Sequence, residues 1–276
     1  MAITAAMVKE LRDKTGAGMM DCKKALTECE ADVEKALDWL RQKGLSKAAK
    51  RADRATSEGV IACATGNNGK VAAIVEVMTE TDFVARGEKF QDFAKTVAEE
   101  VAANAPENLD AFQDRVNDLA ASTGEKTVLG RFVRMSIEGE GTVGAYVHSN
   151  GKLAVLVEVL TDKAADENVA DFAKNVAMQI AAANPLALDA SSLDPALLER
   201  EREVYRQKAL AEGKPEKIID KIAEGAVKKY CKEVCLLDQA YIRDDKMSVQ
   251  DLMKATAKAA GCNVTIGKFV RIQLGA

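Results

Sequence analysis

The feature that most constrains the fold is an internal near-repeat. A segment beginning at Asn68 recurs farther along the chain, beginning at Asn150. The matching runs are Asn68-Gly69-Lys70 with Asn150-Gly151-Lys152, and Glu76-Val77 with Glu158-Val159. Beyond them, Phe93-Ala94-Lys95 recurs as Phe172-Ala173-Lys174, and these two runs lie closer together in the sequence than the earlier pairs do. The two copies predict two similar structural units, and the shorter separation means that the first copy holds three extra residues.

The extra residues lie between Val77 and Phe93, around the run Thr81-Asp82-Phe83-Val84. A scaffold common to both copies explains what they share, so a local difference is the first place to look for function. The run places an aromatic side chain beside a carboxylate in a polar loop. We therefore expect Thr81, Asp82, Phe83 and Val84 to form a binding element with Phe83 exposed.

Strand and helix patterns follow the same order in both copies. The expected elements are strands 59–64, 70–77 and 130–134 with helices 88–104 and 109–121, and strands 142–148, 153–160 and 267–271 with helix 167–183. Asn150-Gly151 suits the positive φ angles of a type I′ turn. Glu76 and Glu158 stand at equivalent places in apolar strands and are expected to share a scaffold role. The pattern predicts an α+β fold with two ββααβ units and antiparallel sheets.

The second copy also contains a long insertion. The closing strand Gly130–Arg134 recurs as Gly267–Arg271. These two runs are separated by many more residues than the other matching pairs, so the added residues fall within 184–248. Two helical runs fill the insertion, Pro195–Ala211 and Pro215–Lys232, and each proline is expected at a helix start. They predict a helical hairpin, or coiled coil, over residues 188–235 that projects from the body. Self-association through this hairpin, and packing within its own chain, both stay open.

Residues 4–43 predict three short helices ahead of the repeat. Thr4 suits the N-cap of the first helix, and Thr15-Gly16-Ala17-Gly18 should end it. Gly44 is expected to close the third helix. Such a bundle has the look of a ubiquitin-associated (UBA-like) fold, which binds partners through a loop and the adjacent helix ends.

Two segments of this N-terminal part bear on possible partners. Adjacent methionines cannot both face one core, so one of Met19 and Met20 is expected at the surface, while partial burial of both stays open. Residues 45–57 are basic but contain no aromatic residue for base stacking, so we expect a solvated helical linker and no nucleic-acid contact. The basic residues concerned are Lys47, Lys50, Arg51 and Arg54.

Length and composition exclude several broad classes. A chain of 276 residues should hold two or three domains, for which we expect the ranges 1–54, 55–140 and 141–276. The net charge of −4 gives no overall field that attracts nucleic acid. No signal peptide opens the chain, and no apolar run approaches the roughly 20 residues of a membrane span, so we expect a cytoplasmic protein without membrane contact.

Catalytic and metal chemistry lack candidates. His148 is the single histidine, and the six cysteines show no C-x-x-C spacing, so no metal site is expected. Cys231 and Cys235 are expected to be free thiols. The nucleotide-binding glycine loops and the G-x-S-x-G elbow are missing, and Glu80 with Asp82 is expected to be a solvated pair. We therefore expect no enzyme activity and no cofactor.

Two long motifs identify a family. The first runs from Lys9-Glu10-Leu11-Arg12 through Thr15–Leu26 (TGAGMMDCKKAL), and the second is Thr81-Asp82-Phe83-Val84-Ala85. The sequence also agrees with the family at Gly213-Lys214-Pro215 and in the final strand. In this order the motifs closely resemble bacterial elongation factor Ts over almost the whole chain. The sequence departs from the family at Met78-Thr79-Glu80, where members often have Asn-Cys-Glu or a similar run.

The resemblance implies a guanine nucleotide exchange factor for the translational GTPase elongation factor Tu. In this family the Asp-Phe pair of the motif, here Asp82 and Phe83 between Thr81 and Val84, wedges into the GTPase domain near its magnesium site. Such a factor promotes GDP release during protein synthesis. The hairpin would be an association module.

The resemblance also implies two further contacts with the GTPase. Arg12, Met19 and Met20 would dock on a helix of the same domain, and the region around His148 would approach another domain. From the residues alone, His148 is most simply a surface side chain at a strand end. A competing hypothesis is an adaptor whose N-terminal bundle binds ubiquitin-like or helical partners, but it leaves Asp82 and Phe83 unexplained. An RNA-binding role has less support, because the basic residues are dispersed.

Overall fold

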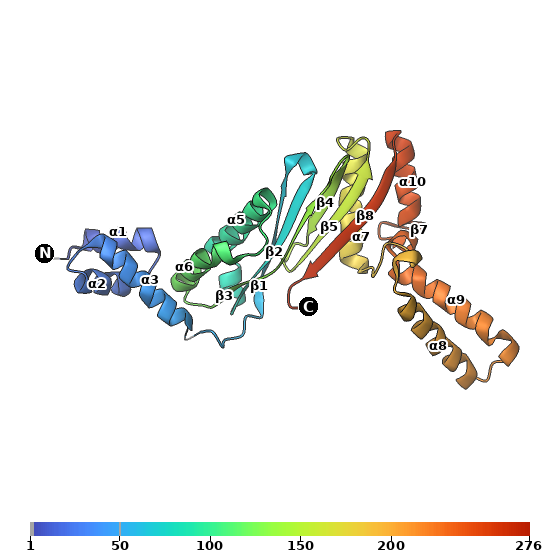
Figure 1. The fold of residues 1–276 in the computed structure, drawn as a ribbon, viewed down its shortest axis with the longest axis horizontal. Coiled ribbons are helices and arrows are strands. Elements are labelled where there is room, and N and C mark those ends of the chain that lie inside the picture. The colour runs from blue at the N-terminus through green and yellow to red at the C-terminus, as the bar shows by residue number, and fades with distance from the viewer. Residues whose placement is uncertain (1–2, 50) are drawn as a thin grey trace.

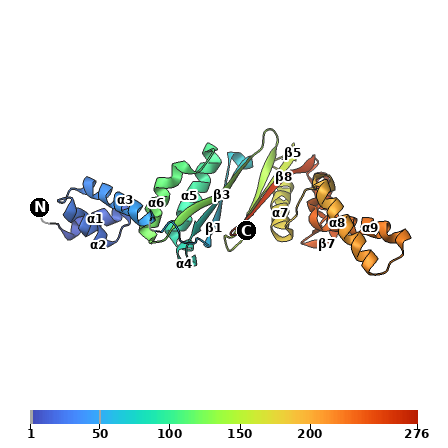
Figure 2. The same ribbon diagram turned by 60° about the horizontal axis from the view of Figure 1, so that its bottom comes forward.

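The chain is elongated, with a helical bundle at its N-terminal end, two sheets in the middle and a helical hairpin at the far end (Figures 1 and 2). The computed structural model describes residues 3–49 and 51–276. Helices alternate with small antiparallel sheets, which confirms the predicted α+β class. Within the described residues, no helix combines the length and the apolar character needed to cross a membrane.

The N-terminal bundle consists of α1 (Ala5–Thr15), α2 (Met19–Glu28) and α3 (Val33–Ala49). As predicted, Thr4 caps α1: its hydroxyl accepts a hydrogen bond from the backbone N–H of Met7 at 3.3 Å. Gly16 ends α1 at φ +66°, a left-handed conformation that glycine adopts without a steric penalty. Leu11 and Leu26 are fully buried where the three helices meet.

Helix α3 is longer than predicted, because it continues through Gly44 to Ala49. A glycine inside a helix costs about 1 kcal/mol relative to alanine. Here α3 lies beside α6 (Gln113–Thr123), where a Cβ atom at Gly44 would be in ordinary van der Waals contact, 3.5 Å from the Cβ of Ala121. Packing between the two helices thus outweighs the local tendency of Gly44 to end α3.

The linker predicted as a solvated helix over 45–57 is helical up to Ala49, where α3 ends, but not over the described residues 51–57. The Arg51 side chain donates to the carbonyl of Ala120 at 3.0 Å. The same prediction for Lys50, and for the side chain of Lys47, lies outside the part of the chain that the structure describes. The linker is therefore attached to the body of the protein through Arg51.

Two units with the same order of strands follow the linker. The first contains β1 (Glu58–Gly66), β2 (Val71–Thr79), α4 (Asp82–Ala85), α5 (Glu88–Asn104), α6 and β3 (Thr127–Ser136). The second contains β4 (Gly141–Val147), β5 (Leu153–Thr161), α7 (Glu167–Ala183), α10 (Val249–Ala260) and β8 (Val264–Gln273). Each sheet is antiparallel, in the orders β1-β2-β3 and β4-β5-β8. The helices predicted over 88–104 and 167–183 are confirmed as α5 and α7.

Short elements complete the chain. They are the 3-10 turns η1 (Asn67–Gly69), η2 (Asp110–Phe112), η3 (Ala190–Ser192) and η4 (Leu236–Asp238), and the strand pair β6 (Ala240–Tyr241) and β7 (Asp244–Ser248). The helix predicted over 109–121 is thus divided into the turn η2 and the helix α6. Phe112, Val116 and Leu119 are nevertheless buried, as their helical spacing predicts.

The two sheets pack against each other, and helices cover their outer faces (Figure 1). The shared apolar layer draws on both sheets and includes Ile61, Ile74, Met135, Ala154, Leu156 and Ile272. On the opposite face of the first sheet, Val75 and Val77 meet Phe90 of α5. On the opposite face of the second sheet, α7 and α10 supply the cover. Because β2 is buried on both faces, its sequence is a nearly continuous apolar run.

Glu76 and Glu158 interrupt the apolar middle strands at a shared irregularity. The register of β2 on β3 shifts between Val75 and Val77, and that of β5 on β8 shifts between Val157 and Val159. A side chain at Gly130 or at Gly267 would collide with the carboxylate of Glu76 or Glu158, respectively. Equivalent bulges at equivalent glutamates agree with the scaffold role that the repeat predicts.

The two glutamates differ in their partners. Glu76 is 3% exposed and accepts hydrogen bonds from Arg131, through the backbone N–H at 3.2 Å and Nη2 at 2.8 Å. Burial acts to raise the pKa of Glu76, but the hydrogen bonds from Arg131 outweigh it and hold the pKa below its usual value. Glu158 is less buried and accepts from the backbone N–H of Lys268 at 3.3 Å. The first glutamate is therefore a buried carboxylate that is paired with a half-exposed arginine.

The turn between β4 and β5 is not the predicted type I′ turn. In it Gly151 has φ +67°, but Asn150 does not have the positive φ that this turn type requires. The loop is longer than two residues, because the closing hydrogen bond joins the backbone N–H of His148 to the carbonyl of Leu153 at 2.8 Å. The Asn150 side chain instead accepts from the backbone N–H of Lys152 at 3.0 Å.

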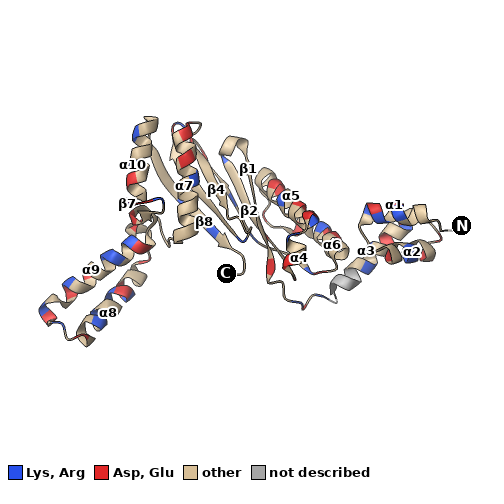
Figure 3. Cartoon of the chain, turned by 180° about the vertical axis from the view of Figure 1, so that it is seen from behind, with Lys and Arg blue, Asp and Glu red and all other residues tan. Residues whose placement is uncertain are grey.

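The insertion forms the predicted antiparallel hairpin of α8 (Pro195–Ala211) and α9 (Glu216–Val234). Pro195 lies in the first turn of α8 as predicted, but Pro215 is the extended N-cap of α9, which begins one residue later. Ala209, Ile219 and Ala223 are buried, whereas charged side chains line both helices along their length (Figure 3). At the base, the backbone N–H of Leu236 donates to the carbonyl of Ala187 at 2.9 Å.

Replacing residues 195–231 with a short Gly-Ser linker should leave the two sheets folded. The first unit lacks this hairpin, and the backbone bond between Leu236 and Ala187 would remain after excision. We expect circular dichroism to show less helix but one cooperative melting transition. Loss of cooperative melting would mean that α8 and α9 belong to the core of the second unit.

Candidate functional site

The three extra residues of the first unit form a helical turn. In the second unit, residues 162–166 join β5 to α7, whereas in the first unit residues 80–87 join β2 to α5 and contain α4. Thr81 is the N-cap of α4, and its hydroxyl accepts a hydrogen bond from the backbone N–H of Val84 at 3.4 Å. The local difference between the copies is therefore a capped turn, at the place where the sequence predicts a binding element.

This turn is anchored on one side and presents Phe83 on the other. Phe83 is 85% exposed, the highest value among the large apolar side chains that the structure describes as exposed. Ala85, two residues later, is 4% exposed and packs in the same cluster as Phe90. Leaving a phenylalanine in water forgoes about 1.5–3 kcal/mol of burial energy. An exposed aromatic on an anchored turn is typical of a side chain that packs against a partner.

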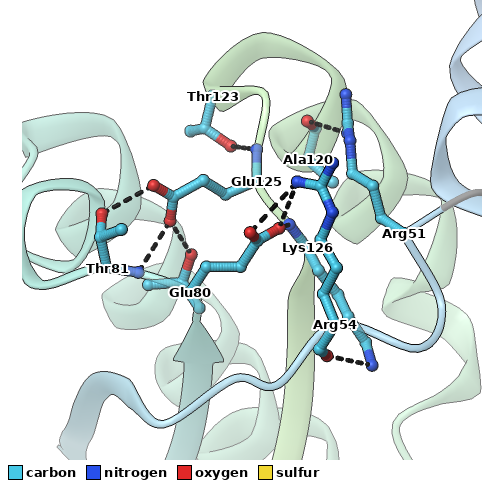
Figure 4. A network of polar contacts seen from close by, with 9 residues as sticks. Arg51, Arg54, Glu80, Thr81, Ala120, Thr123, Glu125 and Lys126 are labelled. Atoms are coloured by element: carbon cyan, nitrogen blue, oxygen red, sulfur yellow. Dashed lines mark hydrogen bonds and ion pairs between the residues drawn. The ribbon is translucent and has the colours of Figure 1, made fainter.

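Glu125, from the segment between α6 and β3, holds the start of the turn (Figure 4). Its carboxylate accepts three hydrogen bonds: from the Thr79 hydroxyl at 3.0 Å, the Thr81 backbone N–H at 2.9 Å and the Thr81 hydroxyl at 2.6 Å. Hydrogen bonds to an ionised carboxylate are stronger than those between neutral groups. The residues before α4 are thus attached to a distant part of the first unit.

Glu80 joins the same region to the linker. Its carboxylate accepts from the backbone N–H of Lys126 at 2.6 Å and from Nη1 of Arg54 at 3.2 Å. The Lys126 N–H first, and Arg54 after it, hold the pKa of Glu80 below its usual value. The Lys126 ammonium in turn donates to the carbonyls of Ala52 and Arg54. The prediction that Glu80 is simply solvated is wrong, because its carboxylate binds Lys126 and Arg54. The local sequence does not indicate these contacts.

Asp82 lies on a groove that also contains His148. The groove has a volume of about 550 Å³ and lies between α4, the start of β1 and the turn between β4 and β5. Asp82 pairs with Arg86 across one turn at 3.1 Å and remains partly exposed. His148 is exposed, and its Nδ1 lies 3.0 Å from the hydroxyl of Tyr146. The structure thus brings together two residues that the sequence placed in different units.

The groove is closed at its base by contacts between the units. The backbone N–H of Ile61 donates to the carbonyl of Gly151 at 2.7 Å. The ammonium of Lys152 pairs with Glu58 at 2.6 Å. Because these contacts join β1 to the turn after β4, the distance between α4 and His148 is set by the packing of the two sheets.

Arg12, Met19 and Met20 lie in the bundle and outside this groove. Met19 is 57% exposed and Met20 is 74% exposed, both in the first turn of α2. Both methionines are therefore at the surface, where the sequence predicts one. The reason is that Cys22, Ala25 and Leu26 fill the buried face of α2 by themselves. Arg12 is exposed beside a second cleft, which Asp118 of α6 also lines.

Sequence reasoning missed the residues that hold the turn, namely Arg54, Glu125 and Lys126. They lie up to 46 residues from their partners Thr79, Thr81 and Glu80, so no local pattern indicates the contacts. One signal was nevertheless present in the repeat. The alignment that matches the two closing strands, Gly130 with Gly267, also matches Glu125 with Cys262, which makes Glu125 a difference between the copies.

The site offers packing and charge. Among the residues that the structure describes, no three His, Cys, Asp or Glu side chains are grouped to hold a metal ion. The prominent features of the site are an exposed aromatic side chain, a partly exposed carboxylate and a groove next to them. These are the parts of a contact surface for a macromolecule.

Fold and site together define an α+β interaction protein that presents one aromatic side chain on a capped turn. A family model described as "Elongation factor TS" matches residues 80–276. Elongation factor Ts from Nitratidesulfovibrio vulgaris is 60% identical over 278 residues, covering 100% of this chain and 96% of the relative. The corresponding protein from Desulfovibrio desulfuricans is 57% identical over 283 residues, with 100% and 99% covered. The chain belongs to the elongation factor Ts family.

More distant members match over the same length. Elongation factor Ts from Clostridium perfringens (strain SM101) is 48% identical over 284 residues, covering 99% of this chain and 93% of the relative. The similarity to all three relatives therefore includes the N-terminal bundle and the inserted hairpin as well as the two sheets.

Phe83→Ala should leave the melting temperature within about 2 °C of the wild type, because an exposed side chain contributes little to stability. Phe90→Ala is the matched control, since Phe90 is 1% exposed in the core of the same unit. Truncating a buried phenylalanine costs about 3–5 kcal/mol, or about 6–20 °C in a domain of this size. Circular dichroism melts measure both values. A similar loss for the two variants would contradict the exposed position of Phe83.

Proposed function

We propose that this protein is a guanine nucleotide exchange factor for elongation factor Tu and promotes GDP release during protein synthesis. Membership of the elongation factor Ts family supports the proposal. The observation that carries it is Phe83, 85% exposed on a turn that Glu125 and the core hold in place. A wedge must keep its shape when it meets its target, and an anchored aromatic satisfies that requirement.

The proposed action involves no covalent step. A GTPase holds GDP largely through its phosphates and a Mg²⁺ ion. Insertion of Phe83 and Asp82 near that ion would displace packed side chains and bring in a carboxylate that competes with the phosphates for the metal, which weakens nucleotide binding. The coupling is reciprocal: if the factor lowers the affinity for nucleotide, nucleotide lowers the affinity for the factor equally. Release then follows from competition between two ligands of the GTPase.

Two further surfaces fit a GTPase of several domains. His148 faces the same groove as Asp82, so it is proposed to touch a second part of the GTPase while the wedge is inserted. Met19 and Met20 form an exposed apolar pair on α2, and flexible thioether side chains adapt well to a partner helix. With Arg12, they are proposed to dock the UBA-like bundle on the domain that Phe83 enters.

The hairpin is proposed to be a surface for self-association. Val204 is 54% exposed and Ile218 is 42% exposed, and they lie on the two helices of the hairpin. An isolated helical pair with exposed apolar side chains gains stability by covering them. The variant that lacks residues 195–231 provides the material to test this by sedimentation.

Phe83→Ala should reduce the acceleration of GDP release from elongation factor Tu by about 30-fold, because loss of an aromatic anchor costs about 2 kcal/mol or more. Asp82→Ala should act in the same direction but less strongly, since it removes charge without removing packing. Release of a fluorescent GDP analogue measures both rates.

Leu186→Ala is the matched control for Phe83→Ala, because it truncates another exposed apolar side chain, which is 57% exposed and lies outside the groove, the bundle and the hairpin helices. It should accelerate GDP release as the wild type does. A folded Phe83→Ala variant with wild-type exchange activity would refute the wedge.

Deleting residues 1–49 should weaken binding to elongation factor Tu without lowering the GDP release rate at saturation. The bundle carries Met19 and Met20, whereas the linker contacts of Arg54 to Glu80 remain in this truncation. Loss of a docking contact raises the concentration for half-maximal effect and leaves the maximal rate unchanged. A titration of the release rate against factor concentration measures both. Normal half-saturation with a lower maximal rate would contradict a docking role.

A further inference from the structure

The two units can be compared atom by atom at the junction that precedes α4 in the first unit. Thr79 corresponds to Thr161, and each is the last residue of the middle strand. After it, Glu80 accepts from the backbone N–H of Lys126 at 2.6 Å. In the second unit, Asp162 accepts from the backbone N–H of Asn263 at 3.1 Å. This contact is common to both units, so it belongs to the scaffold.

Glu125 is different, because its counterpart Cys262 cannot replace its contacts. Cys262 lies 3.4 Å from the Thr161 hydroxyl through its sulfur, and a thiol is a weak hydrogen-bonding group. Glu125 makes the corresponding contact to Thr79 and adds two to Thr81. A unit without the aromatic turn thus folds with cysteine at this position, and the unit with the turn has a glutamate there.

The two additional contacts act on the cap of α4. The Thr81 hydroxyl has one hydrogen, and it points to the Glu125 carboxylate, which can only accept. The lone pairs of the same oxygen are thereby left for the backbone N–H of Val84, which caps the turn. A helix of four residues does not stay folded through its own hydrogen bonds. Glu125 therefore holds the cap of α4 from one side, while the buried Ala85 and the contact of Gln91 with the carbonyl of Ala85 hold its end.

We infer that Glu125 is a positioning residue for the exchange reaction, which holds Phe83 in the orientation that its partner requires. This inference rests on the proposed function, because Glu125 itself does not contact the GTPase and affects exchange only by positioning α4. Its effect should be on the maximal GDP release rate more than on binding, because the bundle with Met19 and Met20 and the turn that carries His148 do not depend on Glu125.

The test is a double-mutant cycle between Glu125→Ala and Phe83→Ala, measured as GDP release from elongation factor Tu over a range of factor concentrations. Glu125→Ala alone should lower the maximal rate about tenfold, in the range that a displaced functional group produces. Because Glu125 acts through α4, which carries both Phe83 and Asp82, adding Glu125→Ala to Phe83→Ala should cause much less than a further tenfold loss. Glu125→Gln should give an intermediate loss, since one oxygen becomes an NH2 group and the amide can accept from the Thr81 hydroxyl or from the Thr81 backbone N–H, but not from both.

Two variants separate positioning from general stability. Glu125→Cys introduces the residue that the second unit accommodates at Cys262, so it should fold and show the same tenfold loss as Glu125→Ala. Glu100→Ala removes an ion pair with Arg115 at 2.6 Å in the same unit, away from the turn, and should leave GDP release unchanged.

Each outcome of the cycle has one meaning. Multiplicative losses in the double variant would overturn the inference, as would full activity of Glu125→Ala and Glu125→Cys alongside an inactive Phe83→Ala. If the wild-type protein itself fails to accelerate GDP release, the proposed function fails, and that result is separate from any difference between the Glu125 variants.

Discussion

The structure depends on the apolar contact between the two sheets. Ile74 and Leu156, from the middle strand of each sheet, are fully buried in the layer that joins them. Each middle strand must therefore be apolar on both faces, because a helix covers the outer face as well. The same contact fixes the turn after β4 against β1 and so creates the groove that Asp82 and His148 share. Without it, the two candidate contact residues would belong to separate bodies.

A duplicated scaffold can accept additions where they do not disturb this contact. The bulges at Glu76 and Glu158 lie in both middle strands and are common to the units. The aromatic turn and the helical hairpin instead follow the ends of strands or helices, at the periphery of the sheets (Figure 1). Additions at such places cost little stability, because loops close with a small entropic penalty that grows slowly with length. The two units could thus diverge in function while keeping one frame.

Much of the candidate site was predictable because the two copies of the repeat can be compared within one chain. Phe83 was identified as exposed and Thr81 as part of the element, since three residues are present in only one copy. The exposure of both Met19 and Met20 was harder to predict, because periodicity does not say how many residues fill a small core. Glu125 could have been found from its alignment with Cys262, but its role depends on a hydrogen bond to Thr81 across 44 residues.

The sequence by itself determined many elements of this protein: apolar periodicity sets α5 and α7, Pro195 marks the start of the hairpin, and Gly213 with Pro215 marks the turn between its helices. These are local properties, since each depends on neighbours within a few turns. Only the tertiary structure decided that α3 passes through Gly44, that Glu80 is bound to Arg54, and that Asp82 meets His148 at one groove. Those outcomes depend on packing and hydrogen bonds between segments that are distant in the sequence. The energies of these contacts outweigh local preferences, and no periodic pattern in the sequence indicates them.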